Sequence, residues 1–284
     1  MAKIISVVNF KGGVAKSTTA FNLAAALWMC GKRVLIVDAD PQYELTTRIG
    51  FNAPNADTLY EWMLSEGSNE ELDAPIYNRY AGNEDFCLIP SSPKVSTIEQ
   101  ALLRQTDRYD SPYFILRKLI RKYCMDFDYI FIDCPPSPGF MNKLALIASD
   151  EIIVPVECAG ESIDGLIKLE QTIQSIKAKA NPELHIKGYL LTKYDERTKI
   201  TRQIRYEISK EGLLINTKIR SSIKFKEAGM FYKNIFEYDP NGNGAEDYMK
   251  LAEELFGVER PENWKTISAG YWERCIGSQL KDEE

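Results

Sequence analysis

Residues 11–18 read KGGVAKST and directly follow the apolar run IISVV of residues 4–8. An apolar strand, a glycine-rich turn and a lysine followed by hydroxyl side chains are typical of a loop that binds phosphates. The small residues let backbone N–H groups surround the anion, and the following helix directs its positive end toward it. The pattern predicts a nucleotide-binding loop made of Gly12, Gly13, Val14, Ala15, Lys16, Ser17 and Thr18.

Apolar runs alternate with helical patterns along the chain, which predicts an α/β fold. We expect one P-loop NTPase-like domain over residues 1–284, with a mostly parallel twisted sheet and helices on both faces. Residues 50–85 are predicted to be a helical insertion, and residues 257–284 a peripheral C-terminal segment. The expected strands are 3–9, 33–38, 86–90, 128–133, 151–156 and 187–192, and the clearest helices are 16–30, 161–179 and 199–211.

Carboxylates stand at the ends of two further apolar runs. Asp38 and Asp40 lie in the string VDADPQ of residues 37–42, and carboxylates two residues apart at a strand end point the same way. Ligands of open sheets bind at the carboxyl ends of strands, so one carboxylate is expected to organise magnesium and the other to orient an attacking water. Asp133 ends the run DYIFID and is expected to hold magnesium through a water. The predicted magnesium set is Ser17, Asp38 and Asp133; the alternative is that these carboxylates only end strands.

Three of these strings resemble the ParA/MinD family of dimerising ATPases. Residues 11–18 resemble its deviant Walker-A loop, KGGVGKTT or KGGVGKST, and differ from it at Ala15. If that position needs a positive φ, the alanine Cβ costs about 1 kcal/mol. DADPQ resembles the A′ motif, although the family continues with Gly-Asn where this chain has Tyr43-Glu44, and DCPPS of residues 133–137 closely resembles ParA proteins.

The resemblance implies that the cofactors are ATP and Mg²⁺ and that ATP binding produces a homodimer. Lys11 would reach across the dimer interface to the nucleotide of the other subunit, Asp40 would activate the attacking water, and Asp38 would support it. Together with Lys16, which would reach the β- and γ-phosphates, these are the predicted catalytic residues.

Charge is unevenly distributed along the chain. The net charge is −6, but residues 187–233 hold twelve basic and five acidic residues, a surplus of about seven positive charges. Such a stretch is either a solvated basic face or a surface for a polyanion. Residues 219–228 resemble a family segment in which Lys224 falls on an arginine associated with DNA contact, which favours non-specific binding of double-stranded DNA. The predicted DNA-binding residues are Arg197, Lys199, Arg202, Arg205, Lys218, Arg220, Lys224 and Lys226.

Composition limits the alternatives. No apolar run approaches the roughly 18–20 residues of a membrane helix, and the first strand leaves no room for a signal peptide, so no membrane partner is expected. Six cysteines without a C-x-x-C pair are typical of reduced thiols, and the single histidine, His185, excludes most histidine-based catalysis and zinc chemistry. A cytoplasmic protein is expected.

The resemblance implies a slow ATPase of DNA partition, associated with the nucleoid and stimulated by a ParB-like centromere-binding partner. One alternative is a MinD-like or other cargo-positioning ATPase. The MinD-like form would need an amphipathic C-terminal helix, whereas residues 272–284 are acidic. Another alternative is an ATP-gated DNA clamp in which Ala15 leaves little turnover.

Overall fold

The computed structural model describes residues 2–66, 68, 71–80, 82–105, 111–158, 162–209 and 212–267. Seven strands form one sheet in the order β3-β4-β2-β5-β1-β6-β7, and every neighbouring pair is parallel except β3 with β4. This α/β architecture confirms the predicted fold class. The strands are β1 Lys3–Val7, β2 Val34–Asp38, β3 Tyr77–Tyr80, β4 Asn83–Ile89, β5 Tyr129–Asp133, β6 Glu151–Glu157 and β7 His185–Thr192.

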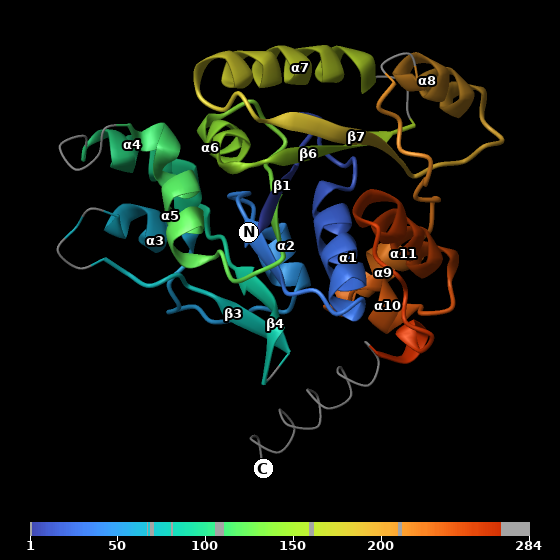
Figure 1. Ribbon diagram of the computed structural model, residues 1–284, viewed down its shortest axis with the longest axis horizontal. Coiled ribbons are helices and arrows are strands. Elements are labelled where there is room, and N and C mark those ends of the chain that lie inside the picture. Colours follow the sequence, from blue (N-terminus) through green and yellow to red (C-terminus); the bar gives the residue numbers. More distant parts are fainter. Residues whose placement is uncertain are drawn as a thin grey trace.

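Helices cover both faces of the sheet (Figure 1). Alternate residues of the central strands enter two hydrophobic clusters: Leu35 and Ile130 belong to the cluster that includes α5, α6 and α7, and Ile36 and Phe131 to the one that includes α1 and α11. Both faces are apolar because both are buried. The helices are α1 Lys16–Met29, α2 Glu44–Arg48, α3 Leu59–Ser65, α4 Ile98–Leu103, α5 Ile115–Tyr123, α6 Phe140–Ala148, α7 Ser162–Lys179, α8 Lys199–Ser209, α9 Lys224–Met230, α10 Ile235–Tyr238 and α11 Asn243–Phe256.

The segment predicted as a helical insertion, residues 50–85, is only partly helical. It contains α3, but it also contains β3 and the start of β4, which form an antiparallel hairpin at the sheet edge. The tyrosines of β3 are favourable in strands, and Tyr80 is fully buried beside Trp28 and Phe86. A buried ion pair of Arg79 with Glu237 fixes the strand further.

The C-terminal segment packs against α11 as far as the structure describes it. Trp264 is buried edge-on against Phe236, and Arg260 pairs with Glu246 and Glu253. The rest of the predicted peripheral segment, residues 268–284, lies outside the described residues, as do Lys210 and Glu211 at the end of the predicted helix 199–211. None of the helices within the described ranges is both long enough and apolar enough to cross a bilayer.

Candidate nucleotide-binding site

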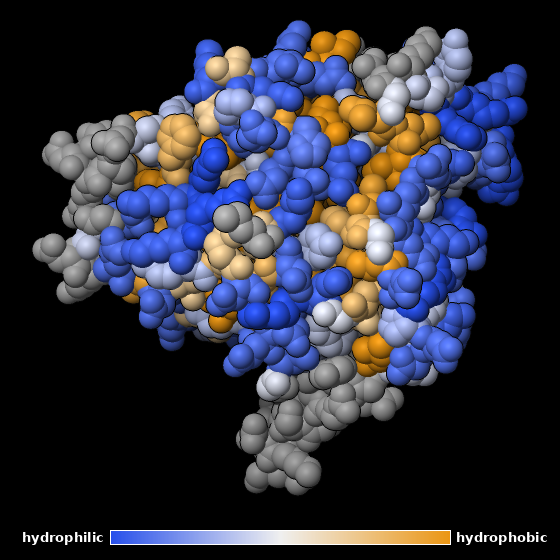
Figure 2. All heavy atoms as spheres, viewed as in Figure 1, coloured by the Kyte–Doolittle hydropathy of each residue, from blue (hydrophilic) through white to orange (hydrophobic). Residues whose placement is uncertain are grey.

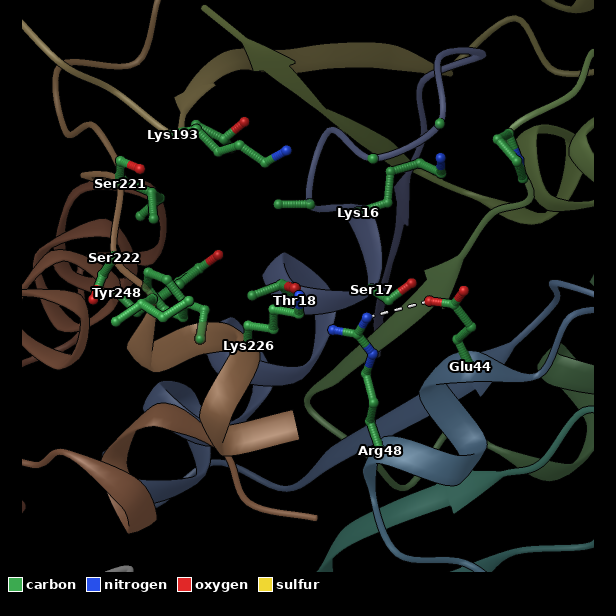
Figure 3. A pocket seen from close by; sticks show the side chains of 18 of the residues that line it. Lys16, Ser17, Thr18, Glu44, Arg48, Lys193, Ser221, Ser222, Lys226 and Tyr248 are labelled. Atoms are coloured by element: carbon green, nitrogen blue, oxygen red, sulfur yellow. Dashed lines mark hydrogen bonds and ion pairs between the residues drawn. The ribbon is translucent and has the colours of Figure 1, made fainter. Parts of the chain in front are cut away.

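A pocket of about 790 Å³ opens at the carboxyl ends of β1, β2, β5 and β7. We call it the nucleotide pocket. Its wall combines the predicted phosphate loop, the turn after β2, α2, and the chain between β7 and α9 (Figure 3). The lining residues are Gly12, Gly13, Ala15, Lys16, Ser17, Thr18, Asp40, Gln42, Glu44, Arg48, Pro136, Thr192, Lys193, Ile219, Arg220, Ser221, Ser222, Ile223, Phe225, Lys226 and Tyr248.

The phosphate loop is held to its surroundings by its own polar groups. The amide of Lys11 donates to Asn9 Oδ1 at 2.9 Å, and the ammonium of Lys16 donates to the Lys11 carbonyl at 3.2 Å. The hydroxyl of Thr192, at the end of β7, donates to the Val14 carbonyl at 3.1 Å. Burial lowers the pKa of Lys16, and the charge of Asp133 opposes this effect. The lysine is therefore buried and partly desolvated at the end of a glycine-rich loop, an arrangement that suits an anion.

Ala15 has φ 69° and ψ 33°, which lies in the left-handed region. It caps the N-terminus of α1, where its carbonyl accepts the Thr19 amide at 2.9 Å. Ala15 therefore adopts a positive φ at the position where the family form has glycine. A residue with a Cβ bears a cost of about 1–2 kcal/mol in this conformation.

The two carboxylates after β2 occupy different environments. Asp38 is fully buried and accepts from the Asp40 amide at 3.1 Å, the Thr46 amide at 2.8 Å and the Thr46 hydroxyl at 2.7 Å. Burial raises the pKa of Asp38 to about 6, although these hydrogen bonds oppose the shift. Asp40 lines the pocket. This arrangement favours the supporting role predicted for Asp38 and leaves Asp40 as the carboxylate that faces a ligand.

Asp133 meets the requirement for a magnesium site. The parallel register sets it opposite Asp38 and Val7 on the neighbouring strands. Neither of its buried oxygens has a hydrogen-bond partner among the described residues. Burial and the charge of Asp38 raise its pKa well above the ordinary value, while the nearby Ser17 hydroxyl and Lys16 oppose that shift. A buried, unpaired carboxylate is costly, so a divalent cation held by Asp133 and Ser17 fits these residues.

The predicted DNA-binding residues fall into two groups. On α8, Lys199, Arg202 and Arg205 are exposed and form no ion pair with any described residue. Thr201, Ile204 and Ile208 form the buried face of that helix. Figure 2 shows hydrophilic residues along the right-hand edge of the molecule, next to the position of α8 in Figure 1. This group is the stronger candidate for a polyanion surface.

The other basic residues have partners or face the pocket. Arg220 binds the buried carboxylate of Asp247 through Nη2 at 2.6 Å, and Lys218 lies over the Tyr194 ring. Arg197 pairs with Asp195 and Lys224 with Glu227, both at exposed positions. Lys226 and Arg220 line the nucleotide pocket. The eight residues therefore do not form one continuous free stripe.

Sequence reasoning missed several residues of the pocket, namely Glu44, Arg48, Thr192, Lys193, Phe225 and Tyr248. They come from α2, the end of β7, α9 and α11, and sequence reasoning gave none of them a role at the nucleotide. The sequence signals available were the departure from the family pattern at Tyr43-Glu44, the end of the expected strand at Thr192, and the family-like stretch 219–228 that contains Phe225. His185 is exposed.

Comparisons with known proteins show the family of the chain. A family model described as an AAA domain matches residues 2–186. The chain is 34% identical over 266 residues to the chromosome partitioning protein ParA of Myxococcus xanthus, covering 93% of this chain and 91% of that protein. It is also 34% identical to the sporulation initiation inhibitor protein Soj of Bacillus subtilis, covering 90% of this chain and 98% of that protein.

Solved structures share the fold. A cobyrinic acid a,c-diamide synthase from Mycobacterium smegmatis, with bound ADP and magnesium, has a TM-score of 0.73 and 29% identity, covering 94% of this chain and 96% of that one. The septum site-determining protein MinD of Pyrococcus horikoshii, complexed with Mg-ADP, has a TM-score of 0.72 and 23% identity, covering 90% and 98%. Because the ParA and Soj relatives align over nearly the whole chain, this protein belongs to the ParA/Soj family of ATPases within the ParA/MinD superfamily.

Proposed function

We propose that this chain is a partition ATPase that binds ATP with magnesium in the nucleotide pocket, dimerises, and then binds DNA without sequence preference. The observation that carries the proposal is that Lys16 and Ser17 lie near the buried carboxylate of Asp133, which has no hydrogen-bond partner within the described part of the chain. A family relative of known role, ParA of Myxococcus xanthus, is a chromosome partitioning protein. We extend that role to this chain.

The chemistry is water attack on the γ-phosphate. Asp40 lines the pocket and orients the attacking water, while Asp38 holds the turn through its bond to the Asp40 amide. Lys16 stabilises the charge that develops on the phosphate oxygens, and Lys11 of the other subunit adds a second positive charge. Magnesium, when bound, would neutralise phosphate charge beside Ser17 and Asp133. Little covalent chemistry is required, so positioning and electrostatics provide the catalysis.

ATP acts as the switch between two states of the protein. The ATP-bound dimer brings two copies of the α8 surface together, and Lys199, Arg202 and Arg205 of each copy contact DNA phosphates. Hydrolysis separates the subunits and releases the DNA. A ParB-like partner accelerates the slow intrinsic step, and the protein works in the cytoplasm on the nucleoid.

Phosphate release with wild type and Asp40→Ala tests the catalytic assignment. Wild type should hydrolyse ATP slowly and only with magnesium present. Asp40→Ala should bind ATP with similar affinity, lose hydrolysis and form dimers that persist on DNA. The assignment of Asp40 is wrong if that variant hydrolyses ATP at the wild-type rate.

A clamp with little turnover is the second candidate, and the left-handed Ala15 favours it. If the strained residue at the start of α1 impairs the loop in the nucleotide-bound state, ATP would hold the protein on DNA without rapid release. The effect of Ala15→Gly on nucleotide affinity separates the two candidates.

A further inference from the structure

An ion pair on α2 lies at the mouth of the nucleotide pocket. Arg48 Nη2 is 3.2 Å from Glu44 Oε2, and the two side chains are 37% and 65% exposed. Both residues line the pocket together with Ser17. Figure 3 shows Arg48 reaching from α2 toward Ser17, with the Glu44 carboxylate beside Ser17 at the same end of the guanidinium group. No motif of the phosphate loop or of the strand ends assigns a role to this pair.

The side chain of Arg48 also lies close to a second element, α9. A Cβ built at Gly229 of α9 would lie 3.7 Å from Arg48 Nη1 and 3.8 Å from its Cγ. The arginine therefore runs across the backbone of α9 at a position that carries no side chain. It also borders a small hollow formed with Ser17, Thr18 and Asn22 of α1. The ion pair with Glu44 on α2 holds the guanidinium, and the hollow places Arg48 beside Ser17 and Thr18 at the start of α1.

Glu44 acts on the electrostatics of the phosphate site. Burial lowers the pKa of Lys16, and the acidic groups that oppose this effect include Glu44 after Asp133, Cys134 and Asp40. Glu44 is thus within electrostatic reach of the lysine expected to bind the phosphates. A polyphosphate in the pocket would attract Arg48 and repel Glu44, so it would act against the ion pair from both sides.

We propose that Arg48 is a further ligand of the nucleotide phosphates and that Glu44 holds it in position until the nucleotide binds. The inference rests on the proposed function, in which this pocket binds ATP. An exposed pair within one helix is weak and easily broken. A guanidinium bound to phosphate oxygens makes charge-assisted, often bidentate hydrogen bonds that are stronger. Arg48 therefore exchanges the Glu44 carboxylate for a phosphate oxygen when ATP enters.

Dissociation constants for Mg-ATP, measured by calorimetry without DNA, test this exchange. Arg48→Gln should raise the dissociation constant about tenfold or more, because a charge-assisted contact is lost. Glu44→Gln should lower it several-fold, because Arg48 is then free and a nearby negative charge is gone. Lys94→Gln is the matched control, since Lys94 forms an exposed pair with Glu61 at 2.7 Å and does not line the pocket; its dissociation constant should match the wild type.

Each outcome bears on the proposal. Arg48→Lys retains the charge and should lose less affinity than Arg48→Gln, and circular dichroism confirms that each variant is folded. Should Arg48→Gln fail to fold, Glu44→Gln still tests the exchange, because it leaves Arg48 in place. The proposal is overturned if Arg48→Gln binds ATP within twofold of the wild type or if Glu44→Gln binds more weakly. If the wild type itself does not bind ATP, the proposed function fails and the inference fails with it.

Discussion

Replacing Ala15 by glycine should stabilise the fold and leave ATP affinity nearly unchanged. Ala15 lies at φ 69° and ψ 33°, where a residue with a Cβ bears a cost of about 1–2 kcal/mol. Glycine removes that cost, but it lowers the free energy of unfolding by about 0.5–1 kcal/mol because it gives the unfolded chain more conformational freedom. The expected net gain is about 0.5–1 kcal/mol, which corresponds to an increase in Tm of about 1–2 °C for a chain of this size.

Nucleotide affinity should change little, because protein contacts fix the conformation of the loop. The Ala15 carbonyl accepts the Thr19 amide at 2.9 Å, and the neighbouring Val14 is buried and bonded to Thr192. The strain therefore belongs to the fold and is the same with and without nucleotide. We expect the dissociation constant of ATP to change by less than about threefold, a difference below 1 kcal/mol. Thermal unfolding and calorimetry measure the two quantities.

Gly31→Ala provides the reciprocal control. Gly31 ends α1 at φ 76°, away from the pocket, and a Cβ built there meets nothing within 4 Å. That variant should lose about as much stability as Ala15→Gly gains. The reasoning is refuted if Ala15→Gly binds ATP tenfold or more tightly with an unchanged Tm. The cost would then arise only on nucleotide binding, which would favour the clamp with little turnover.

Three other predictions concern pH, DNA and the buried ion pair. Burial raises the pKa of Asp38 to about 6, so between about pH 4 and pH 6 the folded protein keeps a proton that the unfolded chain has lost. The free energy of unfolding of the wild type, measured relative to Asp38→Asn by urea denaturation, should therefore fall as pH rises through this range. A difference between the two proteins that stays constant with pH would contradict this prediction. Arg202→Ala combined with Arg205→Ala should reduce the slope of log DNA affinity against log salt by about two, with ATP affinity unchanged; an unchanged slope would exclude α8 from the DNA contact. Glu237→Ala removes the buried carboxylate that pairs with Arg79 and should lower the free energy of unfolding by about 3–5 kcal/mol in urea denaturation; a loss below 1 kcal/mol would show that the ion pair contributes little.

The parts of the site that sequence predicts well are local or lie at strand ends. The phosphate loop is one continuous stretch, so its strand, turn and helix could be read directly. Asp133 is opposite Asp38 because parallel strands bring their carboxyl ends to one edge. These features follow from short-range patterns and from one rule of sheet geometry.

Sequence could not predict features that depend on distant packing. Strand β3 contains the polar residues Asn78 and Arg79, so its sequence does not resemble an apolar strand. Its place at the sheet edge depends on the burial of Tyr80 against Trp28 of α1. Arg48 lies beside Gly229, a residue far along the chain, and only the fold brings the two together. Basic residues counted alike in sequence also differ in space, since Arg220 is bound to Asp247 while Arg202 is unpaired among the described residues.

Nucleotide-dependent binding to random-sequence duplex DNA across a salt series tests the central claim most directly. The wild type should bind tightly with ATP, and the affinity should fall steeply as salt rises. Binding should be weak with ADP or without nucleotide, and Lys16→Ala should remain weak under all three conditions. Equal binding with ATP, with ADP and without nucleotide, or no binding in any of them, would contradict the proposal that the nucleotide pocket controls the basic surface.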